Sequence, residues 1–174
     1  YVYTLDRTNG KFLSAAPFVN LITWGKPNPE TGKAMPVAVA PKMGGPRVEI
    51  CPGLVGATSW GSKSYSPRTS YMYIPTNEFC VSLGYREELT YKRGAFYTGA
   101  VHDHLAKTDQ AGALRAFDVN TNRIVWEWWN KTPLISFTLA TGGDLVFTGT
   151  MEGKVVAVDA RTGEQLWEFN VGTP

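Results

Sequence analysis

The stretch of sequence that decides the fold runs from Gly112 to Pro174: GALRAFDVNTNRIVWEWWNKTPLISFTLATGGDLVFTGTMEGKVVAVDARTGEQLWEFNVGTP. One pattern occurs twice within it: an aspartate that ends an apolar run, then threonine with asparagine or glycine, and then a tryptophan. Asp118 and Asp159 are 41 residues apart, and so are Trp126 and Trp167. A fixed period of about 40 residues indicates a repeat architecture, with one supersecondary unit in each period.

Each copy of the pattern is typical of a β-hairpin. The alternation in Lys154–Asp159 predicts a strand, and Gln165–Asn170 predicts the returning strand. Between them, aspartate accepts hydrogen bonds from nearby backbone N–H groups, and Gly163 supplies the positive φ that the turn needs. Asn122 stands at the position of Gly163, and asparagine tolerates that conformation well. Two adjacent hairpins make a four-stranded blade, so we expect an all-β protein, a β-propeller segment of about three to four four-stranded blades with long loops.

The tryptophans of the repeat are expected to pack between blades. A large flat indole fits between neighbouring sheets, so we predict that Trp126 and Trp167 are both buried against the next blade. Trp128 should share the face of Trp126, and Trp129 should point the other way, because side chains alternate along a strand. For this aromatic cluster, packing is the preferred interpretation over stacking on a substrate.

The chain before the repeat begins with a related hairpin. Strands are expected at Tyr1–Leu5 and Lys11–Ser14, and the turn Asp6–Gly10 has the same four-residue step from aspartate to glycine as the later copy. Ala15–Pro46 then carries six prolines, which leave room for few regular elements. We expect this segment to be a long excursion, either a surface decoration or a cover over a functional site.

The middle of the chain has weaker signals. Short strands are expected at Arg47–Ile50 and Tyr71–Pro75. The mixed charges in Asn77–Thr90 favour a surface excursion, and Lys92–Ala100 is expected to return as a strand. His102–Gln110 is expected to be a polar connection into the repeat.

Two histidines in this connection are candidate metal ligands. His102 and His104 flank Asp103. On a strand the two histidines would share a face and could chelate zinc or copper. Two ligands do not make a site, and no third candidate stands near in sequence. Surface-loop histidines are therefore the preferred interpretation.

The repeat pattern Ala-x-Asp-x-x-Thr-Gly-x-x-x-Trp resembles the tryptophan-docking motif of the PQQ-dependent (quinoprotein) alcohol and methanol dehydrogenases. Further segments resemble parts of the same family, in the family's order: Tyr1–Lys11, Pro17–Trp24, Cys51–Trp60, Tyr65–Pro67 and Leu139–Thr150. Together they span nearly the whole chain. The resemblance implies that residues 1–174 are part of a single quinoprotein β-propeller domain, as an interior to C-terminal-half fragment.

The same resemblance implies a function. It is that of a periplasmic enzyme that oxidises a primary alcohol by hydride transfer to PQQ, with a Ca²⁺ or lanthanide ion, and passes electrons to a c-type cytochrome. The family places its metal ligands and catalytic aspartate before Tyr1, so no catalytic or metal-ligating residue is assigned here. The fragment alone is expected to be inactive. The alternative is a non-catalytic PQQ-like-repeat propeller that serves as a scaffold or binding protein, although the family-like segment Cys51–Trp60 favours the enzyme.

Ser59 is the one candidate for contact with the cofactor. In the family, the loop Gly56–Trp60 places an asparagine, or in some members an aspartate, against the quinone. Here that position is Ser59. A serine hydroxyl can donate to or accept from the quinone, but it is shorter, so a bridging water is one interpretation. The other is an ordinary turn serine, and the sequence does not separate the two.

Cys51 and Cys80 are the only cysteines, 29 positions apart. In an oxidising compartment two cysteines suggest one disulfide, with two buried free thiols as the alternative. The family resemblance favours the disulfide, because many members have one in this region. The family's ring of two adjacent cysteines is absent from this sequence.

Composition excludes several classes of partner. The net charge of +2 gives no strong field toward nucleic acid or an anionic membrane surface. No apolar run approaches the roughly 18–20 residues of a membrane span. The family resemblance, rather than composition, implies a small alcohol substrate and a c-type cytochrome as partners. Open sheet edges at the ends of a clipped propeller also invite association into a homo-oligomer.

Overall fold

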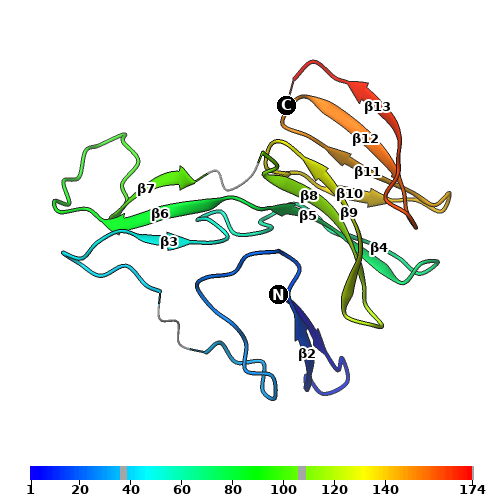
Figure 1. Cartoon of the computed structure of the whole chain (residues 1–174), viewed down its shortest axis with the longest axis horizontal. Helices are drawn as coiled ribbons and strands as arrows, with labels where there is room; N and C mark the ends of the chain where they lie inside the picture. The colour runs from blue at the N-terminus through cyan, green and yellow to red at the C-terminus, as the bar shows by residue number, and fades with distance from the viewer. Residues whose placement is uncertain (36–38, 106–108, 174) are drawn as a thin grey trace.

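The computed structural model describes residues 1–35, 39–105 and 109–173, and all of its regular structure is β-strand. The two central sheets have four antiparallel strands each and lie side by side (Figure 1). The first blade consists of β4 (Ser64–Ser66), β5 (Tyr71–Asn77), β8 (Gly112–Asp118) and β9 (Arg123–Asn130), in that order. The second blade consists of β10 (Thr138–Ala140), β11 (Leu145–Gly149), β12 (Lys154–Asp159) and β13 (Gln165–Asn170). No helix in the described residues is long and apolar enough to cross a membrane.

The repeat turns form as the sequence predicts. Asp118 accepts the backbone N–H of Asn120 at 2.8 Å, and Asp159 accepts that of Arg161 at 2.8 Å. Asn122 has φ +55° and Gly163 has φ +76°, so both adopt the left-handed conformation. The strands on either side of the Asp159 turn have the predicted bounds. Local turn chemistry therefore sets the register of these hairpins.

The N-terminal hairpin consists of β1 (Val2–Leu5) and β2 (Phe12–Ala16) and lies beside the first blade (Figure 1). The hydroxyl of Thr4 donates to Asn122 at 3.5 Å, in the turn of the first blade. A small apolar core joins the two parts, with Ala16 and Phe18 packed against Ile74 and Phe117. The predicted hairpin is confirmed, and it approaches the turn of the neighbouring blade.

A separate three-stranded sheet consists of β3 (Val48–Ile50), β6 (Cys80–Tyr85) and β7 (Ala100–Leu105), with β6 in the centre. The strand predicted near residue 48 is confirmed. Three other predictions are wrong: Asn77–Thr90 contains the half-buried central strand β6, Lys92–Ala100 is mostly a loop, and His102–Leu105 lies in a strand. β6 carries no charged residue and pairs with β3, whereas the charges that favoured a surface excursion, Arg86–Glu88, lie in the loop after it.

The number of complete blades is lower than expected. Two four-stranded sheets form within the described residues, rather than three or four, because β3, β6 and β7 make a sheet of their own. In chain order, β6 and β7 are inserted between β5 and β8 of the first blade. The described part of the Ala15–Pro46 excursion has a single isolated bridge, between Pro27 and Ala34, as the prolines predict.

The main core lies between the two blades. Tyr73, Leu114 and Trp126 from the first blade face Val156 and Val158 from the second. The indole of Trp126 is 8% exposed, and its Nε1 donates to the carbonyl of Ala160 at 3.1 Å. The prediction for Trp126 is therefore confirmed.

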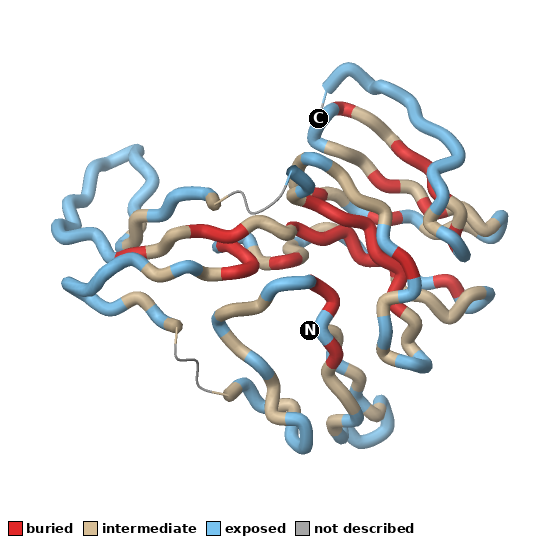
Figure 2. Tube along the Cα trace, in the orientation of Figure 1, coloured by how far each residue is buried: buried red, intermediate tan, exposed pale blue. Residues whose placement is uncertain are grey.

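The prediction for Trp167 is wrong in this structure. Trp167 is 48% exposed and lies on β13, a sheet-edge strand whose residues are all exposed (Figure 2). The two tryptophans have the same motif but different surroundings, because the second blade covers Trp126 and no described blade covers Trp167. Trp128 shares the face of Trp126, as its hydrogen bond to Gln165 of the second blade shows.

Candidate functional site

The loop Cys51–Trp60 leads into the first blade and ends at the junction of both blades. Ser59 is half-buried there, and its hydroxyl makes no hydrogen bond to another described residue. Its carbonyl accepts the ammonium of Lys63 at 3.0 Å. A side chain added at Gly61 would meet the carbonyl oxygen of Ser136, just before the second blade, at 1.9 Å, so only glycine fits this approach. The unpartnered hydroxyl of Ser59 can donate to or accept from a ligand or a water.

Asn77 holds this loop in place and was not found from the sequence. Its backbone N–H donates to the carbonyl of Ala57 at 2.6 Å, and its Nδ2 lies 3.4 Å from the carbonyl of Gly56. Asn77 is 2% exposed, and its Oδ1 is buried without a partner among the described residues. Its place at the end of a central strand is what lets it reach the loop. The asparagine therefore positions the backbone two residues before Ser59.

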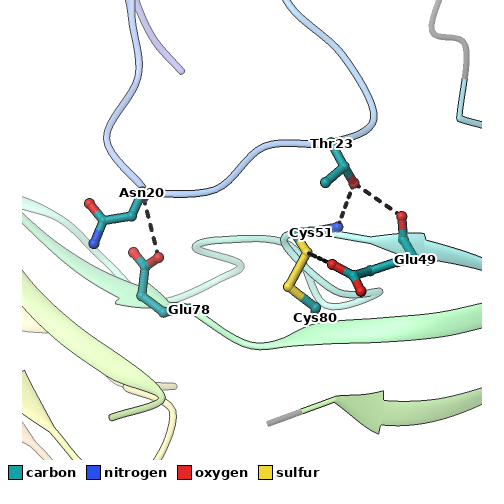
Figure 3. The surroundings of a disulfide bond; sticks show 6 residues. All are labelled: Asn20, Thr23, Glu49, Cys51, Glu78 and Cys80. Atoms are coloured by element: carbon teal, nitrogen blue, oxygen red, sulfur yellow. Dashed lines mark hydrogen bonds between the residues drawn. A yellow bond between two sulfur atoms is a disulfide. The ribbon is translucent and has the colours of Figure 1, made fainter. Parts of the chain in front are cut away.

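The predicted disulfide between Cys51 and Cys80 is confirmed, with an S–S distance of 2.03 Å (Figure 3). It ties the start of the loop to β6, and both cysteines are buried. Figure 3 also shows the excursion lying against this bond: Thr23 accepts the N–H of Cys51 at 2.9 Å and donates its own N–H to the Cys51 carbonyl at 2.9 Å. Asn20 donates to Glu78 at 3.3 Å. The excursion thus lies against the disulfide and against Glu78, the residue that follows β5.

A buried arginine stands beside Asn77 in the first blade. Arg115 is fully buried and donates to Glu127 at 2.8 Å, to Thr76 at 2.7 Å and to Glu78. Its guanidinium also lies 5.0 Å from the ring centre of Trp129. Two carboxylates compensate the buried charge and a hydroxyl accepts a further hydrogen bond, so removing Arg115 would leave two carboxylates without their cation. Sequence reasoning missed this network, because Arg115 carries no pattern that distinguishes it from a surface arginine.

The described residues contain one group of three potential metal ligands, namely Glu49, Cys51 and Cys80. The two sulfurs are bonded to each other, so neither is the thiolate that binds a metal. His102 and His104 lie on a strand with ring centres 6.0 Å apart, rather than in a loop, and no third described ligand joins them.

The aspartates of the repeat turns have structural roles. Hydrogen bonds from the turn hold the pKa of Asp6, Asp118 and Asp159 below the ordinary value, from Thr8, Asn120 and Thr162 respectively. These carboxylates stay ionised and satisfied by the backbone. They are poor candidates for a general base, as expected from their place in the turns.

A cavity of about 420 Å³ opens near the disulfide end of the site. Its wall includes Val55 of the loop, and its other apolar residues come from the segments that lead into and out of the strands. Glu78 and His104 supply the ionisable groups of the lining. The remaining apolar lining includes Phe79, Leu105, Ala111, Pro133, Ile135 and Met151. The lining is therefore mostly apolar, with Glu78 and His104 among its polar residues.

Known proteins match the chain at both the sequence and the structural level. A family model described as outer membrane protein assembly factor BamB matches residues 101–174. A quinoprotein ethanol dehydrogenase of Pseudomonas putida is 37% identical over 99% of this chain and 29% of its own length. A lanthanide-dependent methanol dehydrogenase of Methylacidiphilum fumariolicum is 36% identical over 98% of this chain and 29% of its own length.

Solved structures agree with these matches. A europium-containing methanol dehydrogenase superposes with a TM-score of 0.87 at 34% identity, over 98% of this chain and 30% of that one. A quinohemoprotein alcohol dehydrogenase from Comamonas testosteroni gives 0.83 at 31% identity, over 98% of this chain and 27% of that one. The all-β propeller fold is thereby confirmed. Spanning somewhat under a third of the length of these relatives, the chain belongs to the family of quinoprotein alcohol and methanol dehydrogenases.

Proposed function

We propose that the chain is part of a PQQ-dependent alcohol dehydrogenase that oxidises a primary alcohol, and that residues 1–174 form part of a single propeller domain. The observation that carries the proposal is the similarity to quinoprotein alcohol dehydrogenases over 99% of the chain, including the loop with its disulfide. The chain supplies two blades and the loop that leads into the first of them. In this reading Ser59 is the residue that would contact the cofactor.

One group in the loop, the hydroxyl of Ser59, could hydrogen-bond to a quinone. The hydroxyl of Ser59 is half-buried and free among the described residues, at a junction that Asn77 and the disulfide keep in place. When bound, PQQ would accept the hydride of the alcohol. Ser59 would hold an oxygen of the cofactor, directly or through a water.

The metal would be held by residues outside this chain. Two relatives have a metal in their names, a lanthanide-dependent and a europium-containing methanol dehydrogenase. Ca²⁺ is the other expectation. Hard cations of this kind need clustered carboxylate and carbonyl oxygens. Among the described acidic residues, Glu78 and Glu127 pair with Arg115, and Asp144 pairs with Arg68 at 2.9 Å. The one group of three potential ligands among the described residues, Glu49 with Cys51 and Cys80, includes the two bonded sulfurs. The chain alone is therefore proposed to be inactive.

A periplasmic location and a c-type cytochrome as electron acceptor complete the proposal. A disulfide persists in an oxidising compartment, which supports the location. One relative, 35% identical, is named a lupanine 17-hydroxylase with cytochrome c in its name. Both points concern the parent protein, and a cytochrome reduction assay tests the second of them.

The second candidate function is a non-catalytic propeller scaffold. The observation that favours it is the family model described as an assembly factor, which matches the repeat region. A scaffold needs the blades but has no use for a cofactor loop. Binding of PQQ therefore separates the two candidates.

The test uses the parent protein that contains this chain, and the chain by itself. We expect the parent protein, supplied with PQQ and Ca²⁺ or a lanthanide, to oxidise primary alcohols in a dye-linked assay, and the chain alone to show no turnover. Ser59→Ala in the parent should weaken PQQ binding, measured by fluorescence titration, whereas Ser82→Ala, on the separate three-stranded sheet, should leave it unchanged. A parent protein that binds no PQQ would favour the scaffold.

A further inference from the structure

The chain leaves the first blade and enters the three-stranded sheet through residues 77–79, which we call the junction. At its two ends the junction is bonded to the loop of the candidate site. The N–H of Asn77 donates to the carbonyl of Ala57 at 2.6 Å, and the carbonyl of Phe79 accepts the N–H of Gly53 at 3.0 Å. Alternate residues of an extended segment direct their backbone groups to the same edge, so the loop lies along one edge of the junction.

These bonds hold most of the loop up to the candidate cofactor residue. The disulfide fixes Cys51, the first residue of the loop. Gly53 lies against the junction so closely that a Cβ built on it would be 2.7 Å from the ring of Phe79. Ala57 is the last residue held by the junction, and Ser59 follows it by two positions. The position of Ser59 therefore depends on the geometry of the junction.

The middle residue of the junction, Glu78, bonds to the blade instead of to the loop. Its N–H donates to the carbonyl of Ala111, just before β8, at 2.8 Å. Its carboxylate, 7% exposed, accepts a hydrogen bond from the buried Arg115 of β8. Side chains alternate along an extended segment, so holding Glu78 on the face of Arg115 keeps Asn77 on the opposite face. There the Nδ2 of Asn77 lies 3.4 Å from the carbonyl of Gly56.

Arg115 has a second carboxylate partner, which lies away from the junction. Glu127 is on β9, the last strand of the first blade, and accepts the Nε of Arg115 at 2.8 Å. Its other oxygen accepts the indole N–H of Trp129 at 3.2 Å. The other oxygen of Glu78 instead accepts the N–H of Asn20 in the excursion at 3.3 Å (Figure 3). The two glutamates thus share one cation, but only Glu78 belongs to the junction.

We infer that Glu78 is a positioning residue of the candidate site. Anchored by Arg115, it fixes the orientation of the junction, and the junction in turn places the loop and Ser59. Its length matters more than its charge, because it acts by setting where the backbone of the junction lies. The effect on the loop follows from the bonds described above, whereas the effect on PQQ rests on the proposed function.

The first test shortens each carboxylate by one methylene in the parent protein. Glu78→Asp keeps the charge, but its carboxylate reaches Arg115 only if the junction moves. Glu127→Asp is the matched control, because it shortens the other partner of the same cation. Hydrogen exchange, followed by mass spectrometry, reports on the bonded N–H groups of Gly53 and Asn77. We expect exchange at both groups to be about tenfold faster in Glu78→Asp and unchanged in Glu127→Asp.

The complementary variant, Glu78→Gln, keeps the length and removes the charge. Its amide oxygen can still accept from Arg115, so exchange in the loop should stay close to that of the wild type. Circular dichroism and the Tm of each variant show that it is folded under the conditions of the measurement. Equal exchange in Glu78→Asp and Glu127→Asp would overturn the inference, and so would fast exchange in Glu78→Gln with slow exchange in Glu78→Asp.

Fluorescence titration with PQQ extends the test to the cofactor. Glu78→Asp should weaken binding by about tenfold, while Glu78→Gln and Glu127→Asp should bind like the wild type. Glu78 also lines the cavity of about 420 Å³, so its charge has a direct route to a ligand. Weak binding by Glu78→Gln with unchanged exchange would show that direct route and refute the positioning role. A wild-type parent that binds no PQQ refutes the proposed function, and the exchange comparison still decides how Glu78 acts on the loop.

Discussion

Replacing Trp126 by alanine tests the contact that holds the two blades together. The indole is 8% exposed, lies over Gly163, and packs against Tyr73 with ring centres 5.8 Å apart. The substitution removes the ring from the main core and leaves a cavity between the sheets. It also removes the hydrogen bond from Nε1 to Ala160, although Tyr73 still donates to the same carbonyl at 3.0 Å. The acceptor therefore stays satisfied, and the loss is mainly one of packing.

The expected loss is about 3–5 kcal/mol of unfolding free energy, the range for truncating a buried aromatic side chain. Trp167→Ala is the matched comparison, because the residue, its motif and its strand position are the same. Trp167 is 48% exposed, so its truncation should cost only about 1 kcal/mol. Both values come from urea unfolding, followed by circular dichroism at low protein concentration so that association does not contribute.

The difference between the two variants is the informative quantity. If they lose equal stability, burial against the second blade contributes nothing to Trp126, and the account of the interface is wrong. If Trp126→Ala costs less than about 1 kcal/mol, the site collapses around the missing ring or the blades do not pack as described.

Three further outcomes follow from the structure. Breaking the disulfide by the pair Cys51→Ser and Cys80→Ser should cost about 3 kcal/mol in urea unfolding, from closure of a loop of about 30 residues, and an unchanged midpoint would contradict this. Gly163→Ala should destabilise more than Gly10→Ala: both glycines have positive φ, but only the first would also collide with the indole, so equal shifts in Tm would argue against the contact. Hydrogen bonds from the turn, Thr162 first, lower the pKa of Asp159 in the folded state, so its contribution to stability is complete above the unfolded pKa of about 3.9 and is lost as the pH falls through the folded pKa. The stability of Asp159→Asn should therefore change less than that of the wild type between neutral and acid pH, and parallel pH profiles would refute it.

The sheet inserted into the first blade shows where local signals fail. β6 and β7 lie where the sequence favours a surface excursion and a polar connection, since charged residues and histidines surround them. β6 becomes a central strand because β3, some 30 residues earlier, pairs with it, and that pairing is not written in either segment alone. Long-range partners of this kind are visible only in the tertiary structure.

Some residues of the candidate site could likewise be located from local sequence, and others only from the tertiary structure. The loop around Ser59 and the two cysteines could be located by resemblance, because their motifs are local. Asn77, which holds the loop, could not be located from the sequence. Its two hydrogen bonds cross about 20 residues of sequence and depend on where β5 ends. Arg115 is a similar case, since its burial follows from strand pairing rather than from its neighbours in sequence.

The sequence by itself determined the repeat, its period, the Asp-to-Gly turns and the strands on either side of them. These features depend on side chains that act within a few residues: an aspartate that bonds to its own turn, a residue that tolerates positive φ, and alternation along a strand. Only the tertiary structure decided which tryptophan is buried. Trp126 and Trp167 share one motif, and their environments differ because burial depends on what lies against a face, which no local pattern encodes.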